Sequence, residues 1–280
     1  MQTVSRILLV LHPEETFRDR VSRIGAMRFR CWSVPDWESL REALLEAPPA
    51  ALAIVDPFME SPGRKELSPE LRQILFDFAS VTVLAVVELQ GDRIRDVNTL
   101  KEWGVAEIID SDSETTQEAI EHRLRQAYGY PIHRLLERAL PSHISGRARA
   151  ILVKAAEVAA AGGQGRDLAR LLHLSERTLL RWCERSHLPP PRRVMAWMRI
   201  LFASDLLDDE GRTVLSVAHA CGYVSDSSLR RAMQDFLGTA PTALREKGAF
   251  QTASAVFTKE LADIRRTARE QREVEYLRNR

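Results

Sequence analysis

Short apolar runs and amphipathic stretches alternate along the first 130 residues. Runs typical of β-strands lie at 6–11, 28–34, 50–55, 81–87 and 106–109. Helical periodicity separates and follows them, at 15–25, 36–47, 68–79, 92–103 and 115–128. Five strands alternating with five helices predict an α/β fold, a doubly wound sheet whose central strands are parallel and buried. Ligands bind such sheets at the carboxyl ends of the strands, so the residues there matter most.

The second half of the chain is helical after a break. A short connecting helix is predicted over 130–140, and the stretch ALPSHISG at 139–146 has the proline, serine and glycine content typical of a hinge. The pattern therefore divides the chain into four parts. These are an α/β domain at 1–130, a connecting helix and hinge at 131–146, an all-helical domain at 147–247 and a charged amphipathic helix or tail at 248–280.

Two segments about fifty residues apart share one arrangement, a short helix, a tight turn and a second helix. In the first, GRDLARLLHL precedes SERTLLRWCERS, and Ser175 is expected to cap the second helix. In the second, TVLSVAHACGY precedes SDSSLRRAMQDFLG, with Gly222 in the turn and Ser225 as the cap. The inward positions of the second helices are Leu179, Cys183, Leu229, Met233 and Phe236. Both segments are therefore predicted to be helix-turn-helix units.

The segment between these units predicts a long helix at about 192–208. Pro191 suits its start. Seventeen residues at about 1.5 Å each would span roughly 25 Å. That length would hold two recognition helices near the ~34 Å separation of paired DNA readers. A broad apolar surface is supplied by Val194, Trp197, Met198, Leu201, Ala203, Leu206 and Leu207.

The net charge of +1 conceals an asymmetry between the two halves. Residues 1–140 carry 17 Lys and Arg against 23 Asp and Glu, a balance of −6, and the remaining residues carry 23 against 16, a balance of +7. The basic charge of the second half is mostly arginine, which makes bidentate contacts to phosphates and base edges. Solvated helix faces have the same composition, so the charge favours nucleic-acid binding only modestly.

The sequence predicts a cytoplasmic protein without a membrane partner. Its longest strand-like run, 81–87, is shorter than the roughly 18 residues of a membrane span. The N-terminus lacks the small-residue cleavage site of a signal peptide. Three scattered cysteines, Cys31, Cys183 and Cys221, provide no disulfide framework, which suits a reducing compartment.

Neither a cofactor nor a metal is expected. His219 and Cys221 lie two residues apart and Cys183 and His187 four apart, so a four-ligand zinc site can be imagined across the two pairs. The pairs fall in different helix-turn-helix units, and a turn at Gly222 explains the first pair better. The sequence also lacks a glycine-rich phosphate loop, a nucleophile–base arrangement and paired catalytic carboxylates, so we expect no enzyme.

The order and spacing of the first domain resemble the receiver domain of bacterial response regulators. Asp56, at the end of ALAIVD, falls at the phospho-acceptor position of that family. The resemblance also requires an acidic pair after the first strand, where this chain has Leu11 and His12. Ala85 stands at the hydroxyl position, and the lysine position is taken by Asp110 or Ser111.

Phosphoryl transfer depends on positioning and on charge neutralisation by a metal and a cation, so one aspartate without them is a poor acceptor. We expect Asp56 to be a strand-end residue before a turn at Pro57, in a receiver-like domain that has lost its chemistry. The alternative is that Glu14 and Glu15 supply the metal oxygens. The expected roles of the domain are dimerisation or contact with another protein, and binding of a small ligand at the strand ends is the other option.

Residues 165–245 look like the DNA-binding domain of AraC-type transcription regulators. The resemblance rests on LARLLHLSERTLLR, on MRILFASDLL with Arg199, on VAHACGYVSDSSLRR and on GTAPTALR with Gly238, Pro241 and Arg245. It implies an all-helical domain with two helix-turn-helix units that binds double-stranded DNA. The ligand-binding barrel of many family members has no counterpart here, so a sugar-type effector is not implied.

Four positions depart from the family pattern. Cys183 and Met233 stand where phenylalanine is usual, Leu229 replaces another aromatic residue, and His173 stands at a position that is usually glycine. These changes thin the aromatic core but leave the exposed arginines unchanged, so they bear on stability more than on DNA binding.

The resemblance places the exposed side chains of each second helix in the major groove. Arg177 and Arg181 would each read a guanine and Leu180 a thymine methyl group. Contact with phosphates alone, which carries no sequence information, stays open for every arginine. The expected contacts are Arg177, Thr178, Leu180, Arg181, Ser227, Ser228, Arg230 and Arg231, with Arg192 and Arg193 as phosphate contacts.

The last segment has an apolar stripe at helical spacing, formed by Phe250, Ala253, Phe257, Leu261, Ile264 and Ala268. Such a stripe usually packs on its own protein, although the charged tail also permits a homodimer contact. The leading hypothesis is a bacterial transcription regulator whose receiver-like domain acts without phosphorylation. The alternatives are a phosphorylation-dependent response regulator using Asp56, and an adaptor that contacts RNA polymerase or another regulatory protein.

Overall fold

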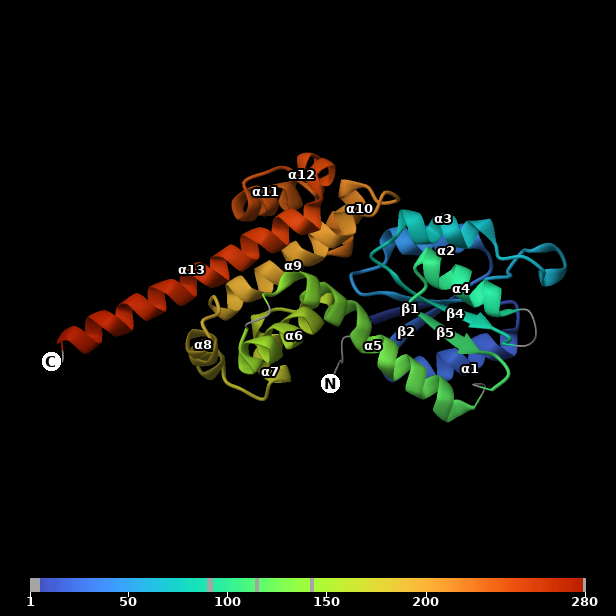
Figure 1. Cartoon of the computed structure of the whole chain (residues 1–280), viewed down its shortest axis with the longest axis horizontal. Coiled ribbons are helices and arrows are strands. Elements are labelled where there is room, and N and C mark those ends of the chain that lie inside the picture. Colours follow the sequence, from blue (N-terminus) through green and yellow to red (C-terminus); the bar gives the residue numbers. More distant parts are fainter. Residues whose placement is uncertain (1–5, 90–92, 114–115, 142–143, 279–280) are drawn as a thin grey trace. The chain divides into compact units, whose positions relative to one another are not determined.

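The computed structural model describes residues 6–89, 93–113, 116–141 and 144–278 (Figure 1). The predicted helix starts at 92 and 115, and residues 142–143 of the predicted hinge, lie outside these ranges. Contacts divide the chain into two compact units, of which the first holds residues 1–131 and 206–225 and the second holds 132–205 and 226–280. Within the described ranges, no helix is long and apolar enough to cross a membrane.

The first unit contains the predicted five-stranded sheet. The strands are β1 (Arg6–Leu11), β2 (Phe29–Val34), β3 (Leu52–Val55), β4 (Thr82–Val87) and β5 (Glu107–Asp110). They are all parallel in the order β2-β1-β3-β4-β5, which is the order of flavodoxin-like folds. The prediction of a doubly wound, receiver-like domain is therefore confirmed.

Helices cover both faces of this sheet. They are α1 (Glu15–Gly25), α2 (Trp37–Glu46), α3 (Pro69–Asp77), α4 (Ile94–Trp103) and α5 (Gln117–Ala139), with a short 3-10 helix, η1, at Pro62–Arg64. Successive residues of a strand point to opposite faces. Leu9 and Leu11 accordingly belong to the core cluster with α2, α3 and α4, and Leu8 and Val10 belong to the cluster with α1 and α5.

The separate connecting helix predicted over 130–140 is wrong, because α5 runs without a break to Ala139 and includes Pro131. Proline inside a helix removes one hydrogen bond and costs about 3 kcal/mol. Burial on either side offsets this cost, since Ala127, Ile132 and Leu135 are each at most 2% exposed. Tertiary packing therefore continues a helix that the local sequence would end.

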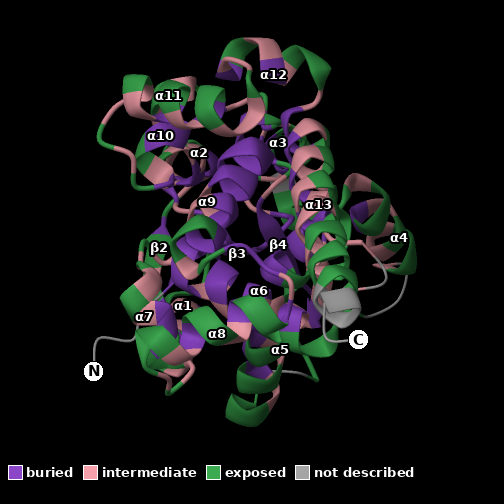
Figure 2. Ribbon diagram, turned by 90° about the vertical axis from the view of Figure 1, so that its left-hand side faces the viewer, coloured by how far each residue is buried: buried purple, intermediate pink, exposed green. Residues whose placement is uncertain are grey.

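The second unit is all-helical, as predicted. Its helices are α6 (Gly146–Ala160), α7 (Gly165–Leu171), α8 (Glu176–Arg185), α9 (Pro191–Leu207), α11 (Asp226–Leu237), α12 (Pro241–Lys247) and α13 (Ala249–Arg278). The last two residues of α9 and all of α10 (Val214–Ala220) belong to the first unit by contacts. In Figure 2, α9 is buried along most of its length, whereas the far part of α13 is exposed.

The predicted helix-turn-helix pairs appear as α7 with α8 and α10 with α11 along the chain. In the second turn Gly222 adopts a φ of +76°, as expected for a helix-ending glycine. In the first turn His173 adopts a φ of +54°. A side chain in this left-handed region costs roughly 1–2 kcal/mol, which gives the physical reason why glycine suits the position.

We expect His173→Gly to raise the free energy of unfolding by about 0.5–1 kcal/mol, because glycine adopts the left-handed conformation without a steric cost. The matched control is His133→Gly, at an exposed position inside α5. Glycine there should lower stability by about 1 kcal/mol. Urea unfolding of both variants checks the pair, and a loss of stability in His173→Gly would show that the histidine side chain contributes more than the turn strain costs.

Candidate nucleic-acid interface

Helix α8 presents one apolar face to the core and one basic face to solvent. The Ser175 hydroxyl accepts a hydrogen bond from the Thr178 N–H at 3.1 Å, which confirms the predicted cap. Leu179 and Cys183 are buried as expected, and burial raises the pKa of the Cys183 thiol to about 11. Arg177, Leu180 and Arg181 are exposed. Leu179 and Cys183 are four residues apart on the buried face, and Arg177 and Arg181 are four residues apart on the exposed face. The core contacts and the candidate DNA contacts therefore lie on different faces of α8.

The polar residues at the start of α8 form a small hydrogen-bonded group. The Thr178 hydroxyl oxygen lies 2.8 Å from the Ser175 hydroxyl and accepts from the Arg181 guanidinium at 3.5 Å. Thr178 is only half-buried, so it can orient Arg181 as well as face a ligand.

Helix α11 has the same division of faces. Leu229 and Met233 are fully buried, whereas Ser227, Arg230 and Arg231 are exposed and Ser228 is half-buried. The Arg230 Nε lies 3.3 Å from the Asp226 carboxylate, one helical turn earlier. An exposed pair of this kind contributes little to stability and releases the guanidinium easily.

Helix α9 lies between the two basic helices, with α8 and α11 on opposite sides of it in both views (Figures 1 and 2). The Trp197 ring of α9 packs edge-on against Phe236 of α11, with centroids 4.9 Å apart, and lies 5.1 Å from Phe257 of α13. Trp197 is fully buried. One aromatic side chain thus fixes α11 and α13 to the central helix.

Arg193, one of the expected pair of phosphate contacts, is bound to a carboxylate of the chain itself. Its guanidinium donates two hydrogen bonds of 2.6 Å to the Glu260 carboxylate and lies 4.8 Å from the Phe236 ring centroid. The hydrogen bonds to Glu260 raise the pKa of Arg193. The Arg193 side chain therefore joins α9 to α13. Among the described contacts, Arg192 has no bidentate carboxylate partner of this kind.

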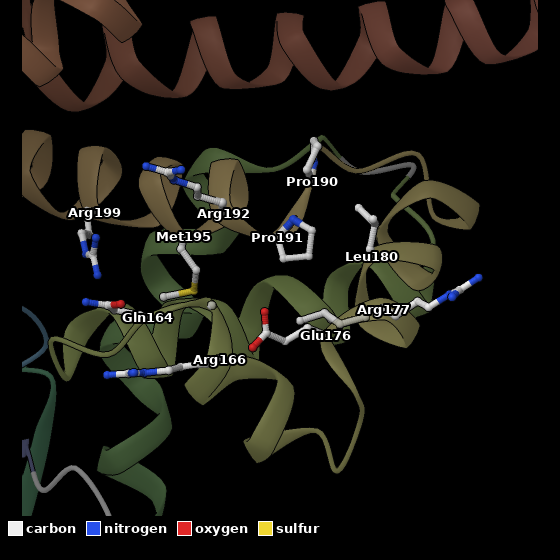
Figure 3. A pocket seen from close by; sticks show the side chains of 12 residues that line it. Gln164, Arg166, Glu176, Arg177, Leu180, Pro190, Pro191, Arg192, Met195 and Arg199 are labelled. Atoms are coloured by element: carbon white, nitrogen blue, oxygen red, sulfur yellow. The ribbon is translucent and has the colours of Figure 1, made fainter.

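A groove of about 810 Å³ opens between the start of α7, the first turns of α8 and the start of α9. Figure 3 shows Met195 pointing into it, with Gln164 and Arg199 at one end and Arg177 directed away at the other. Four arginines line the groove, Arg166, Arg177, Arg192 and Arg199, against one acidic residue, Glu176. This composition favours an anionic ligand with some apolar surface, such as a sugar–phosphate backbone.

Two of these arginines were not among the predicted contacts. Arg166 lies in the first turn of α7, and Arg199 donates a 2.7 Å hydrogen bond to the Gly163 carbonyl in the turn between α6 and α7. The predicted contacts came from the second helices, which the resemblance marks as readers, and from Arg192 and Arg193 at the start of the long helix. The excess of arginine in this half of the chain was the available signal, but it does not say which arginines share a groove.

Asp56 lies fully buried at the carboxyl end of β3, where the sequence placed it. One carboxylate oxygen accepts from the Phe58 N–H at 2.9 Å, and the other accepts from the Arg64 guanidinium at 2.6 Å. Arg93 supports this pair, since it donates to the Arg64 carbonyl at 2.8 Å and stacks 4.0 Å above the Phe58 ring. The charge of Asp56 is therefore neutralised by the chain itself.

The magnesium ion that a receiver would hold beside this aspartate does not fit these residues. Arg64 takes the carboxylate oxygen that a metal would need, and His12 stands at the acidic position. The ring of His12 stacks on Phe17 at 4.2 Å, and its Nδ1 accepts from the Glu14 N–H at 3.2 Å. Burial lowers the pKa of His12, against the opposing effect of the Asp56 charge.

The remaining candidates for a metal site are the histidines and cysteines. Among the residues that the structure describes, no three or more His, Cys, Asp or Glu side chains are grouped so that they could hold a metal ion. His219 lies in α10 and Cys221 follows it at the helix end, as the turn interpretation predicts.

Residues 168–247 match the family described as a helix-turn-helix domain. This match confirms the resemblance of that segment to the AraC-type DNA-binding domain. No curated protein matches the chain. The chain thus combines an AraC-type helix-turn-helix domain with a receiver-like domain, which is the composition of a DNA-binding transcription regulator.

Solved structures show weaker likenesses. NtrX from Brucella abortus, solved in complex with ATP, is 15% identical over 55% of this chain with a TM-score of 0.39. The match covers 35% of the NtrX chain, about a third of its length. Full-length FixJ from B. japonicum is 15% identical over 82% of this chain and 96% of its own, with a TM-score of 0.35. The fold assignment therefore rests on the strand order and register.

The lowered pKa of His12 predicts that the stability of the receiver-like domain depends on pH. Its folded pKa lies below the ordinary 6.5, so the unfolded chain takes up the proton first as the pH falls. The free energy of unfolding of the receiver-like domain should therefore decrease below about pH 6.5. His12→Gln should reduce this dependence in urea unfolding between pH 7.5 and 5.5, whereas His133→Gln, at an exposed site, should leave it unchanged. If the free energy of unfolding of His12→Gln depends on pH as strongly as that of the parent chain, His12 is not the source of the pH dependence.

Proposed function

We propose that this protein binds double-stranded DNA sequence-specifically and regulates transcription, with α8 and α11 inserted into two adjacent major grooves. The observation that carries the proposal is the pair of exposed arginine faces on helices that flank α9. These faces are formed by Arg177 with Arg181 and by Arg230 with Arg231. Ser227 and Ser228 lie beside the second pair. Helices of this kind read base edges with guanidinium groups.

Base contacts and phosphate contacts fall to different residues in this proposal. Arg177, Arg181, Arg230 and Arg231 contact base edges, and Leu180, 38% exposed, contacts a thymine methyl group. Arg166, Arg192 and Arg199 line the groove beside α8 and hold the adjoining phosphates. Arg193 is paired with Glu260, so the proposal gives it a structural role and leaves it out of the phosphate contacts.

The receiver-like domain acts in this proposal without phosphorylation. Its aspartate is already paired with Arg64, and neither His12 nor Ala85 supplies the metal ligand or hydroxyl group that phosphoryl transfer needs. The protein is a cytoplasmic regulator and not an enzyme. Its partner is DNA, while contacts with RNA polymerase or a second copy, through the receiver-like domain or α13, stay predictions.

The first test is selection of bound sequences from a random duplex pool by the full chain. We expect a bipartite motif with halves about one helical turn apart. Arg181→Ala should weaken binding to the selected duplex by roughly 1–3 kcal/mol and relax the first half, and Arg231→Ala should do the same for the second half.

Arg266→Ala is the matched control, because it removes an equally exposed positive charge from the far part of α13. It should leave the motif unchanged. If Arg181→Ala instead weakens all duplexes equally and lowers the salt dependence by about one counterion, the arginine contacts only phosphate. If the full chain binds no duplex, the proposal fails and the adaptor function takes its place.

A second test concerns Asp56. We expect incubation with a small phosphodonor and Mg²⁺ to add no phosphoryl group, as measured by intact mass, because Arg64 occupies the carboxylate. Asp56→Asn should bind the selected duplex with the affinity of the parent chain. A phosphoryl adduct that is absent in Asp56→Asn would establish the phosphorylation-dependent alternative.

A further inference from the structure

The segment that follows α9 packs against the ends of α2 and α3 in the first unit. Residues 206–225 share that unit with the receiver-like sheet, and α10 packs on α2. The Gly211 N–H donates to the Asp77 carbonyl at 2.9 Å. A Cβ on Gly211 would lie 2.8 Å from the Phe78 ring and 3.1 Å from the Asp77 carbonyl. The backbone of the segment therefore approaches the end of α3 as closely as only glycine allows.

A buried ion pair lies at the centre of this contact. Arg212 and Asp209 are bonded at 3.2 Å, with side chains that are each 1% exposed. The Asp209 carboxylate accepts from the Ser80 N–H at 2.8 Å and from the Ser80 hydroxyl at 2.6 Å. The Arg212 guanidinium donates to the Leu45 carbonyl at 3.0 Å and lies 5.8 Å from the Phe78 ring centroid.

These partners belong to the receiver-like domain, and without them two charges would lose much of their hydrogen bonding. A buried ion pair is tolerated only when its remaining donors and acceptors are satisfied. Ser80 and Leu45 satisfy them here, at sequence separations of 129 and 167 residues. The contact is thus specific and polar. We name residues 208–213 the docking loop, and we call its contact with Leu45, Asp77, Phe78 and Ser80 the dock.

The docking loop leads directly into the second helix-turn-helix unit. Thr213 caps α10, and five residues, 221–225, separate α10 from α11. The six Cα–Cα steps from Ala220 to Asp226 span at most about 22 Å, so the start of α11 stays tethered to the part of the chain that holds α10. Both helices of the first helix-turn-helix pair, α7 and α8, lie within the second compact unit, and the neighbouring α9 reaches the first compact unit only with its last two residues.

We propose that the receiver-like domain anchors the second helix-turn-helix unit through the docking loop and so sets the affinity for the second half of the DNA site, while the first half is bound independently. This inference rests on the proposed function. It gives the receiver-like domain a defined part in DNA reading, in place of a phosphorylation switch. Signals that reach this domain would act on one half-site through the dock.

The test uses the full chain with the dock broken in two ways. Gly211→Val introduces a steric clash with Phe78 and Asp77, and Asp209→Ala with Arg212→Met removes both buried charges together. Glu210→Ala, at an exposed position between them, is the control. Circular dichroism and thermal melting of each variant verify that the receiver-like sheet remains folded.

The first measurement is amide hydrogen exchange without DNA. Breaking the dock should raise exchange in residues 206–220 and, together with it, at 42–47 and 77–81, whereas Glu210→Ala should change neither. The second measurement is binding to duplexes that carry the first half-site, the second half-site or both. Both dock variants should lose about tenfold in affinity for the second half-site and keep the affinity of the parent for the first.

Unchanged or tighter binding to the second half-site in both variants, with exchange raised, overturns the inference, because the dock would then be a passive or inhibitory contact. Exchange that rises in only one of the two segments overturns the anchoring itself. A parent chain that binds no duplex overturns the proposed function and the DNA part of the inference, whereas the exchange experiment still decides whether the dock couples the two segments.

Discussion

The ion pair between Asp209 and Arg212 is the interaction on which the organisation of this chain depends. Two charges that are almost fully buried require partners for every strong donor and acceptor, and residues far back in the sequence provide them. The requirement draws the segment between the two helix-turn-helix units into the receiver-like domain. A chain that reads as two successive domains is therefore interleaved, with α9 and the docking loop carrying the chain from one compact unit into the other.

A second internal ion pair supports the proposal that the receiver-like domain acts without phosphorylation. Arg64 donates to Asp56 where a receiver would hold a metal ion, and Arg93 holds Arg64 in place through its carbonyl. The fold keeps the parallel sheet and the buried aspartate, since both follow from strand order and packing. Phosphoryl transfer depends on a few groups at the strand ends, and this chain has His12 and Ala85 at two of those positions. The role proposed for the domain is accordingly mechanical, namely the anchoring of α10.

At the candidate interface, two neighbouring arginines make different contacts. Arg192 and Arg193 are neighbours of equal charge at the start of α9, yet Arg193 joins α9 to Glu260 of α13 and Arg192 lines the groove beside α8. Arg166 and Arg199 line the same groove although they lie on different helices. Helical spacing predicts which face of a helix a residue occupies. It does not say which other helix supplies the neighbouring charge.

The sequence by itself determined the local features. The short apolar strands and the amphipathic helices follow from the spacing of apolar residues. The Ser175 cap and the Gly222 turn follow from backbone sterics and from hydrogen bonds between residues a few positions apart. Only the tertiary structure decided the continuation of α5 through Pro131, the role of Arg193 and the dock of Asp209 on Ser80, 129 residues away. These depend on burial and on partners brought together by folding, which no pattern of spacing along the chain records.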